Sequence, residues 1–169
     1  MSEQPLPESH TLGVRRAVPR DAARLARMVA ALFEHSVASA IDPFTPAHIP
    51  KNLIEVAKWF RALCRDDSAL VLVIESGGQP VGFLKGHRQA PYAVPSRIEQ
   101  VGYISMVWVE PEFRRQGAAR LLVEEAEAAF HEQGVGQMEL HYLHSNEEAR
   151  AAWEALGYVP YRVAAFKAL

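Results

Sequence analysis

The stretch VEPEFRRQGAARLLVEEAEAAF, Val109 to Phe130, decides how the chain is expected to fold. The apolar run YISMVWV ends at Val109 and has the composition of a buried strand. After Glu-Pro-Glu, two arginines, Gln116 and Gly117 lead into a long helical pattern. Arginines at the N-terminus of a helix repel the positive end of its dipole and lower the stability of the helix. This strand-to-helix turn therefore predicts an anionic ligand that compensates the arginines.

The turn brings several hydrogen-bond donors together. Backbone N–H groups at the start of a helix have no intrahelical acceptors. Gly117 permits a positive φ and a close approach of a ligand to the backbone, while Ala118 and Ala119 keep the next turn small. Three guanidinium groups surround these amides, those of Arg114, Arg115 and Arg120. The set suits a phosphate or diphosphate. The alternative is that the arginines are solvated and pair with neighbouring glutamates.

Strand and helix patterns alternate on both sides of this stretch. Asp21 is the expected N-cap of the first helix, and Gly77 with Gly78 predicts a hairpin turn. The resulting order is β-α-α-β-β-β-α-β-α-β, which predicts an α/β fold with a single mixed, mostly antiparallel sheet and helices on both faces. Strands are expected at 12–18, 69–76, 81–88, 100–109, 137–143 and 158–166, and helices at 22–36, 51–64, after Gly117, and at 146–156.

Composition limits the class of protein. The 169 residues suit one domain, expected over residues 11–169 after a flexible N-terminal tail at 1–10. The formal net charge of −2 argues against nucleic-acid binding, which needs a basic face. No run approaches about 18 consecutive apolar residues, so no membrane span is expected. Cys64 is the single cysteine, which favours a reducing, cytoplasmic location and a buried apolar role rather than a nucleophile.

Two motifs carry a resemblance to a known family. The turn lacks both the phosphate-binding loop Gly-x-x-x-x-Gly-Lys-Ser/Thr and the dinucleotide fingerprint Gly-x-Gly-x-x-Gly. Instead, Arg114-x-x-Gly117-x-Ala119 resembles the acetyl-CoA signature of the GNAT superfamily of N-acetyltransferases. Downstream, LHSNEEARAAWEALGYVP (143–160) resembles the second motif of that family, at the family's separation and in its order. The resemblance extends from Leu12 to the C-terminus.

The resemblance implies transfer of an acetyl group from acetyl-CoA to a primary amine of a small molecule or peptide, by direct attack in a ternary complex and without a metal. It also implies a bulge in the strand before the turn, which frees backbone groups for the thioester and the pantetheine arm. Asn146 matches the family's asparagine that binds the pantetheine amide region, and it is also a plain helix N-cap. The implied acetyl-CoA-binding residues are Val107, Trp108, Val109, Arg114, Arg115, Gln116, Gly117, Ala118, Ala119, Arg120 and Asn146.

The catalytic groups match the family less well. Many members place a tyrosine as general acid where this chain has Trp153, and an indole cannot deliver a proton at neutral pH. A thiol pKa of about 8.5 makes the coenzyme thiolate a tolerable leaving group without that acid. The positions that match the family's bases include Tyr103 and His141, and histidine titrates near neutral pH. His141 and His144 form His-x-x-His, but residues three apart on a strand face opposite sides, so no metal site is expected.

Other functions stay open on the sequence alone. Trp153 is compatible with a non-catalytic acyl-CoA-binding module, and the cationic turn with another anion binder such as a nucleotide-binding regulatory domain. The irregular segments 41–50 and 89–99 are expected to shape the acceptor pocket, and their few charges favour a small amine over a basic protein tail. Family members often dimerise, so a homodimer is compatible with the resemblance, although no residue pattern sets the stoichiometry.

Overall fold

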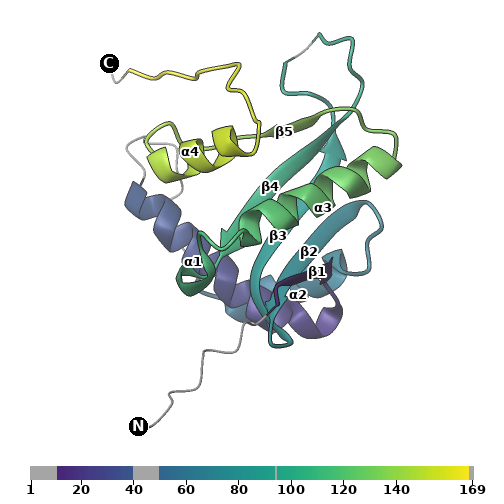
Figure 1. Ribbon diagram of the computed structural model, residues 1–169, viewed down its shortest axis with the longest axis vertical. Helices are drawn as coiled ribbons and strands as arrows, with labels where there is room; N and C mark the ends of the chain where they lie inside the picture. Colours follow the sequence, from purple (N-terminus) through teal and green to yellow (C-terminus); the bar gives the residue numbers. More distant parts are fainter. Residues whose placement is uncertain (1–10, 40–49, 94, 168–169) are drawn as a thin grey trace, which may run out of the picture.

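The structure is a computed structural model that describes residues 11–39, 50–93 and 95–167 (Figure 1). Within these ranges one sheet contains five strands in the order β1-β2-β3-β4-β5. The strands are β1 (Gly13–Arg16), β2 (Ala69–Ser76), β3 (Gln79–Gln89), β4 (Val101–Val109) and β5 (Met138–Leu140). The helices are α1 (Ala22–Ser39), α2 (Leu53–Leu63), α3 (Ala118–Glu132) and α4 (Glu147–Ala155), with short 3₁₀ helices η1 (Pro19–Asp21) and η2 (Pro111–Phe113).

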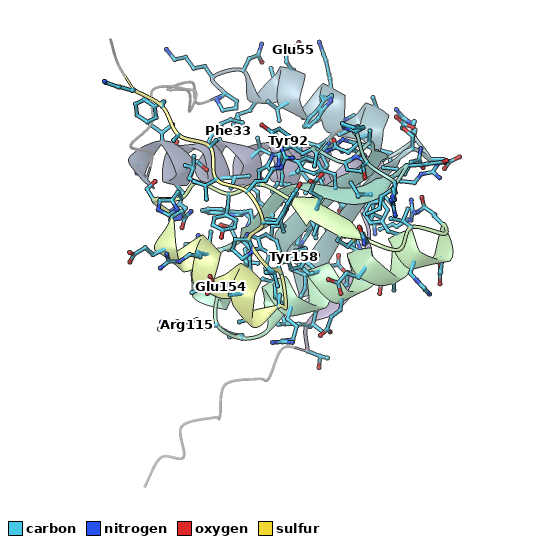
Figure 2. All side chains as sticks on the ribbon, turned by 90° about the horizontal axis from the view of Figure 1, so that it is seen from above. Phe33, Glu55, Tyr92, Arg115, Glu154 and Tyr158 are labelled. Atoms are coloured by element: carbon cyan, nitrogen blue, oxygen red, sulfur yellow. The ribbon has the colours of Figure 1, made fainter. Side chains whose placement is uncertain are left out.

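The strand directions and the helix layers confirm the expected fold class. Neighbouring strands from β1 to β4 are antiparallel, and β5 pairs with β4 in parallel. Figure 2 shows α1 and α2 on one side of the sheet, and α3 and α4 on the other. Side chains alternate between the two faces of β3, so Phe83 packs with α1 and α2 whereas Leu84 packs with α3. Each face therefore buries its own apolar core, centred on Phe60 and on Phe130 respectively.

Asp21 does not cap α1 as expected. It lies at the end of η1, and its buried carboxylate accepts a hydrogen bond from the backbone N–H of Val18 at 2.8 Å. The same carboxylate accepts two hydrogen bonds from Arg15, at 2.7 and 3.0 Å. The side chain thus points back toward β1, because a bidentate guanidinium pair stabilises a carboxylate more than a single helix cap does.

The strand expected at 158–166 does not form. After α4 the described chain continues as an irregular segment to residue 167 (Figure 1). Val159 and Val163 are each 81% exposed in this segment. Pro160 has no N–H group and cannot donate to a strand ladder, which weakens pairing at this point.

A contact between side chains ties this C-terminal segment to β5. The hydroxyl of Tyr161 donates a hydrogen bond to the buried carboxylate of Glu139. A cavity of about 1080 Å³ lies between the segment and β5. β5 is consequently the edge of the described sheet, and it is shorter than the expected 137–143.

Candidate active site

β4 pairs with β5 over only part of its own length. Their parallel register joins 102–104 to 138–140. Gly102 permits this approach, because a Cβ there would lie 2.6 Å from the Met138 sulfur and 2.8 Å from the Phe130 ring. Beyond residue 104, β4 continues to Val109, and no described strand pairs with this side of it (Figure 1). We call this opening the strand split; it leaves backbone N–H and C=O groups of β4 available to a ligand.

The expected bulge is confirmed, at Ser105. The β3–β4 register passes from Lys85 opposite Met106 to Gly86 opposite Ile104, which leaves Ser105 as the extra residue. The Ser105 hydroxyl donates to the backbone oxygen of Lys85 at 3.1 Å. The bulge therefore lies beside the closed end of the strand split, two residues before Val107 rather than at 107–109.

The turn before α3 forms a nest of backbone donors. Gly117 precedes α3 with φ 84°, and Arg115 also has a positive φ of 59°. No backbone acceptor within the described ranges is found for the N–H groups of residues 115–120, and the first bond of the helix runs from the N–H of Leu121 to the oxygen of Gly117. A Cβ at Gly117 would meet no atom within 4 Å, so the space above the turn is open. This arrangement fits the diphosphate of a coenzyme.

The three arginines of the turn have different roles. The Arg114 side chain donates from Nε to the backbone oxygen of Val109 at 3.0 Å, and its guanidinium lies 4.7 Å from the centre of the Trp108 ring. Arg114 therefore fastens the turn to the end of β4. Arg120 donates to the backbone oxygen of Ala155 on α4 at 3.4 Å. Arg115 is exposed at the outer edge of the molecule, and no partner of its side chain is found among the described residues (Figure 2).

The two candidate bases meet at the closed end of the strand split. The Tyr103 hydroxyl lies 3.4 Å from Nδ1 of His141, and the two rings pack edge to face. Burial, together with the charge of Glu139, raises the pKa of Tyr103, so its hydroxyl stays protonated at neutral pH. Tyr92 packs against the other side of the His141 ring, with ring centres 4.9 Å apart. His141 lies just beyond β5, outside the ladder.

Comparison with known proteins agrees with this geometry. A sequence profile of the Acetyltransferase (GNAT) family matches residues 31–158, well over half of the chain. The chain belongs to the GNAT family of acetyltransferases. It is accordingly an N-acetyltransferase of this family, and acetyl-CoA is its acyl donor.

Solved GNAT structures have the same fold. The aminoglycoside N-acetyltransferase AAC(6')-Iy, in complex with CoA, superimposes with a TM-score of 0.77 at 14% identity, covering 97% of this chain and 98% of that one. The aminoglycoside 6'-N-acetyltransferase AAC(6')-Ih from Acinetobacter baumannii gives 0.73 at 19% identity, covering 94% and 99%. The F44R mutant of the BH1408 protein from Bacillus halodurans gives 0.79 at 22% identity, covering 93% and 99%. At these identities the likeness establishes the fold alone.

The second GNAT motif is largely occupied with structural contacts. Asn146 caps α4, since its side-chain oxygen accepts from the N–H of Ala149 at 2.9 Å. Trp153 packs edge to face on Tyr158, with ring centres 5.3 Å apart. The Tyr158 hydroxyl donates to Glu127 on α3 at 3.0 Å, and burial followed by the charge of Glu127 raises its pKa. Neither Trp153 nor Tyr158 is therefore suited to protonate a leaving thiolate.

Sequence reasoning missed a polar group on the α1/α2 face of β3. The Lys85 ammonium donates to the Ser105 hydroxyl at 3.1 Å, and His87 packs edge to face on Tyr103. Burial and the charge of Lys85 lower the pKa of His87, and Nδ1 of His87 is buried with no hydrogen-bond partner among the described residues. The signal was available, because Lys85 and His87 fall on the same face as the apolar Phe83 of a central strand.

The described residues contain neither a metal-binding cluster nor a membrane-spanning helix. No group of three or more His, Cys, Asp or Glu side chains there is arranged to hold a metal ion. His141 and His144 both lie past the end of β5, so the strand geometry assumed for this pair does not apply. No helix in the same residues combines the length and the apolar character needed to span a bilayer.

Proposed function

We propose that this GNAT enzyme transfers an acetyl group from acetyl-CoA to a primary amine of a small molecule or peptide, by direct attack in a ternary complex. The observation that carries the proposal is the alignment of three features. A nest of unpartnered amides at 115–120 leads to the open edge of β4, and that edge ends at the Tyr103–His141 pair. The path thus joins an anion site to a proton acceptor.

Residues along this path have distinct roles toward the coenzyme. The N–H groups of 115–120, with the exposed guanidinium of Arg115, would hold the diphosphate. The free edge of β4 at 107–109 would bind the pantetheine arm and polarise the thioester carbonyl. The side-chain oxygen of Asn146 caps α4, which leaves its side-chain nitrogen available to donate to the pantetheine. Arg114 acts through Val109 and Trp108, by holding the turn in place.

His141 accepts the proton of the attacking amine. When Nδ1–H of His141 donates to the Tyr103 oxygen, Nε2 keeps its lone pair and can take the proton. The new bond joins nitrogen to the acetyl carbon, the carbon–sulfur bond breaks, and the coenzyme leaves as a thiolate. Coenzyme A supplies the activated acyl group and the leaving thiol.

No cysteine supports an acyl-enzyme route. Cys64 is at the C-terminal end of α2, and burial followed by the charge of Asp21 raises the pKa of its thiol. A raised pKa leaves little thiolate to act as a nucleophile. The unpaired thiol also supports the cytoplasm as the compartment of the enzyme.

A small-molecule acceptor receives further support from the neighbours. AAC(6')-Iy has been solved with a bisubstrate analogue that joins CoA to a monomethyl-acetylneamine, which is a small-molecule amine. The support is for the size class of the acceptor and not for its identity.

Calorimetric titration with acetyl-CoA tests the proposal. Gly117→Glu should weaken acetyl-CoA binding by about a hundredfold or more, because it adds a negative side chain at the diphosphate site. Gly134→Glu is a matched control, since Gly134 has φ +79° and open space around it at the opposite end of α3. Wild-type protein that binds no acetyl-CoA, or that prefers ATP or NAD, would overturn the proposal. Thiol release across an amine panel separates transfer from mere binding.

We also propose a homodimer. Each copy has an open β5 edge and an exposed C-terminal segment in which Val159, Tyr161 and Val163 alternate like a strand. An unpaired strand edge readily accepts a strand from another chain. The segment of one copy can therefore pair with β5 of the second, which would bury the valines.

A further inference from the structure

Lys85 is an unusual residue for the centre of a sheet. β3 lies between β2 and β4, and Lys85 is half-buried on the face that α1 and α2 cover. Its Nζ donates a hydrogen bond to the Ser105 hydroxyl at 3.1 Å and lies 5.6 Å from the centre of the Trp59 ring. Burial lowers the pKa of Lys85, so the ammonium is less stable here than in water.

No acidic side chain compensates this ammonium within the described ranges. The ion pairs found there do not include Lys85. Glu139 is the buried acid on the same part of the sheet, but its oxygens accept hydrogen bonds from the Tyr92 N–H and the Tyr161 hydroxyl. A half-buried cation without a counter-ion is costly, and a bound carboxylate would offset the cost.

The position of Lys85 suits the acceptor and not the coenzyme. α3 and the turn before it pack on the opposite face of the sheet, so Lys85 is not part of the amide nest at 115–120. Along β3, Lys85 is two residues from His87, which pairs with Tyr103. His87 packs on Tyr103, which in turn packs on His141, so Lys85 lies on the same face as the Tyr103–His141 pair and about 7 Å along β3 from His87.

We infer that the acceptor is a primary amine that also carries a carboxylate, such as an amino acid, and that Lys85 binds the carboxylate while His141 faces the amine. The inference rests on the proposed function and specifies its substrate class. Ser105 holds the Lys85 side chain at the bulge, which positions the ammonium beside the closed end of the strand split. The Lys85 ammonium would repel a polycationic acceptor, because both carry positive charge.

The test compares matched acceptors by following release of the coenzyme thiol. Each amino acid is assayed beside its carboxamide and its decarboxylated amine, with spermidine as a polycation. We expect the amino acids to exceed their amides in kcat/KM by about tenfold or more, although the amides have more neutral amine at pH 7. Lys85→Met should abolish this preference by raising KM for the amino acids while leaving kcat/KM for the amides unchanged.

Two controls separate the inference from the proposed function. Lys58→Met removes an exposed lysine of α2 that pairs with Glu55, and it should change neither preference nor rate. Acetyl-CoA affinity of Lys85→Met, measured by calorimetry, should equal that of the wild type and also reports that the variant is folded. Three outcomes would overturn the inference while leaving the proposed function intact. They are equal use of amino acids and amides, a preference for spermidine, and a preference for amino acids that persists in Lys85→Met. Absence of acetyl-CoA binding, or of thiol release with every amine, overturns the proposed function.

Discussion

In the proposed reaction, His141 and Tyr103 contribute different parts of one proton transfer. A neutral imidazole accepts a proton at only one of its two ring nitrogens. The hydrogen-bond partner of the other nitrogen determines which of the two accepts. Tyr103 is that partner, at 3.4 Å from Nδ1, and its raised pKa keeps the hydroxyl in place as a neutral group. We therefore propose Tyr103 as a positioning residue for His141 rather than as a second base.

We predict different losses of rate for variants of these two residues. His141→Gln should lose about a hundredfold in kcat, because no group then accepts the proton of the amine, whereas Tyr103→Phe should lose about tenfold. Acetyl-CoA affinity, measured by calorimetry, should stay at the wild-type value in both variants. His144→Gln, at an exposed histidine three residues away, is the control and should match the wild type. An unaltered kcat in His141→Gln would refute the assignment.

Single residues differ in how far the sequence reveals them. The positive φ of Gly117 could be predicted, because a turn that leads from a strand into a helix needs a residue without Cβ. The contact of Lys85 with Ser105 could not, since it depends on a bulge that shifts the register by one residue. The same holds for the packing of the Arg114 guanidinium on the Trp108 ring, which depends on how the turn folds back onto the end of β4.

At the scale of elements, Arg15 joins three segments at the outer edge of the sheet. It lies on β1, pairs with Asp21 of η1, and donates to Glu75 of β2 at 2.5 Å. Both acids raise the pKa of Arg15. Burial opposes ionisation of Asp21, but the hydrogen bonds from Arg15 and Val18 outweigh it and lower the pKa of the carboxyl. The charged cluster therefore fastens the start of α1 to the sheet.

We predict that Asp21→Asn destabilises the fold in a pH-dependent way. At pH 7 the free energy of unfolding should fall by about 2–3 kcal/mol, because Arg15 loses its buried partner. The folded-state pKa of Asp21 is lowered, so its contribution is complete above the unfolded pKa of about 4 and is lost as the pH falls through the folded value. Urea unfolding at neutral pH and toward pH 2 measures this, and the gap between wild type and variant should close in acid. Asp67→Asn, an exposed change, should have no effect, and a gap independent of pH would contradict the argument.

Most helices and strands could be predicted from the sequence, and the segment 158–166 is the exception. Helices and the strands up to β4 have strong periodicity and buried partners in their own chain. The segment 158–166 has a strand period as well, but periodicity does not identify the partner strand, and β5 pairs with three residues of β4 only. The irregular course of the C-terminal segment thus reflects a missing neighbour more than a weak pattern.

At the scale of the whole molecule, the strand split and the open β5 edge lie on opposite sides of one short strand. β5 pairs with β4 through 138–140, and its other edge borders the cavity of about 1080 Å³ beside the C-terminal segment. His141 directly follows β5, so its position depends on the contacts that hold this strand in place. Pairing of a second copy on the outer edge would make β5 an internal strand and hold His141 more firmly against Tyr103.

This coupling predicts that Val163→Asp converts a dimer into a less active monomer. Val163 is 81% exposed in the single chain, so a charge there costs the monomer little, but it would be buried against β5 of a second copy. Sedimentation velocity should show a dimer for the wild type and a monomer for the variant, with acetyl-CoA affinity retained and kcat reduced about tenfold. Ile54→Asp, at a residue 69% exposed on α2, should leave both mass and activity unchanged. A wild-type monomer at assay concentration would rule out the homodimer, and a monomeric variant with full kcat would show that β5 is rigid without it.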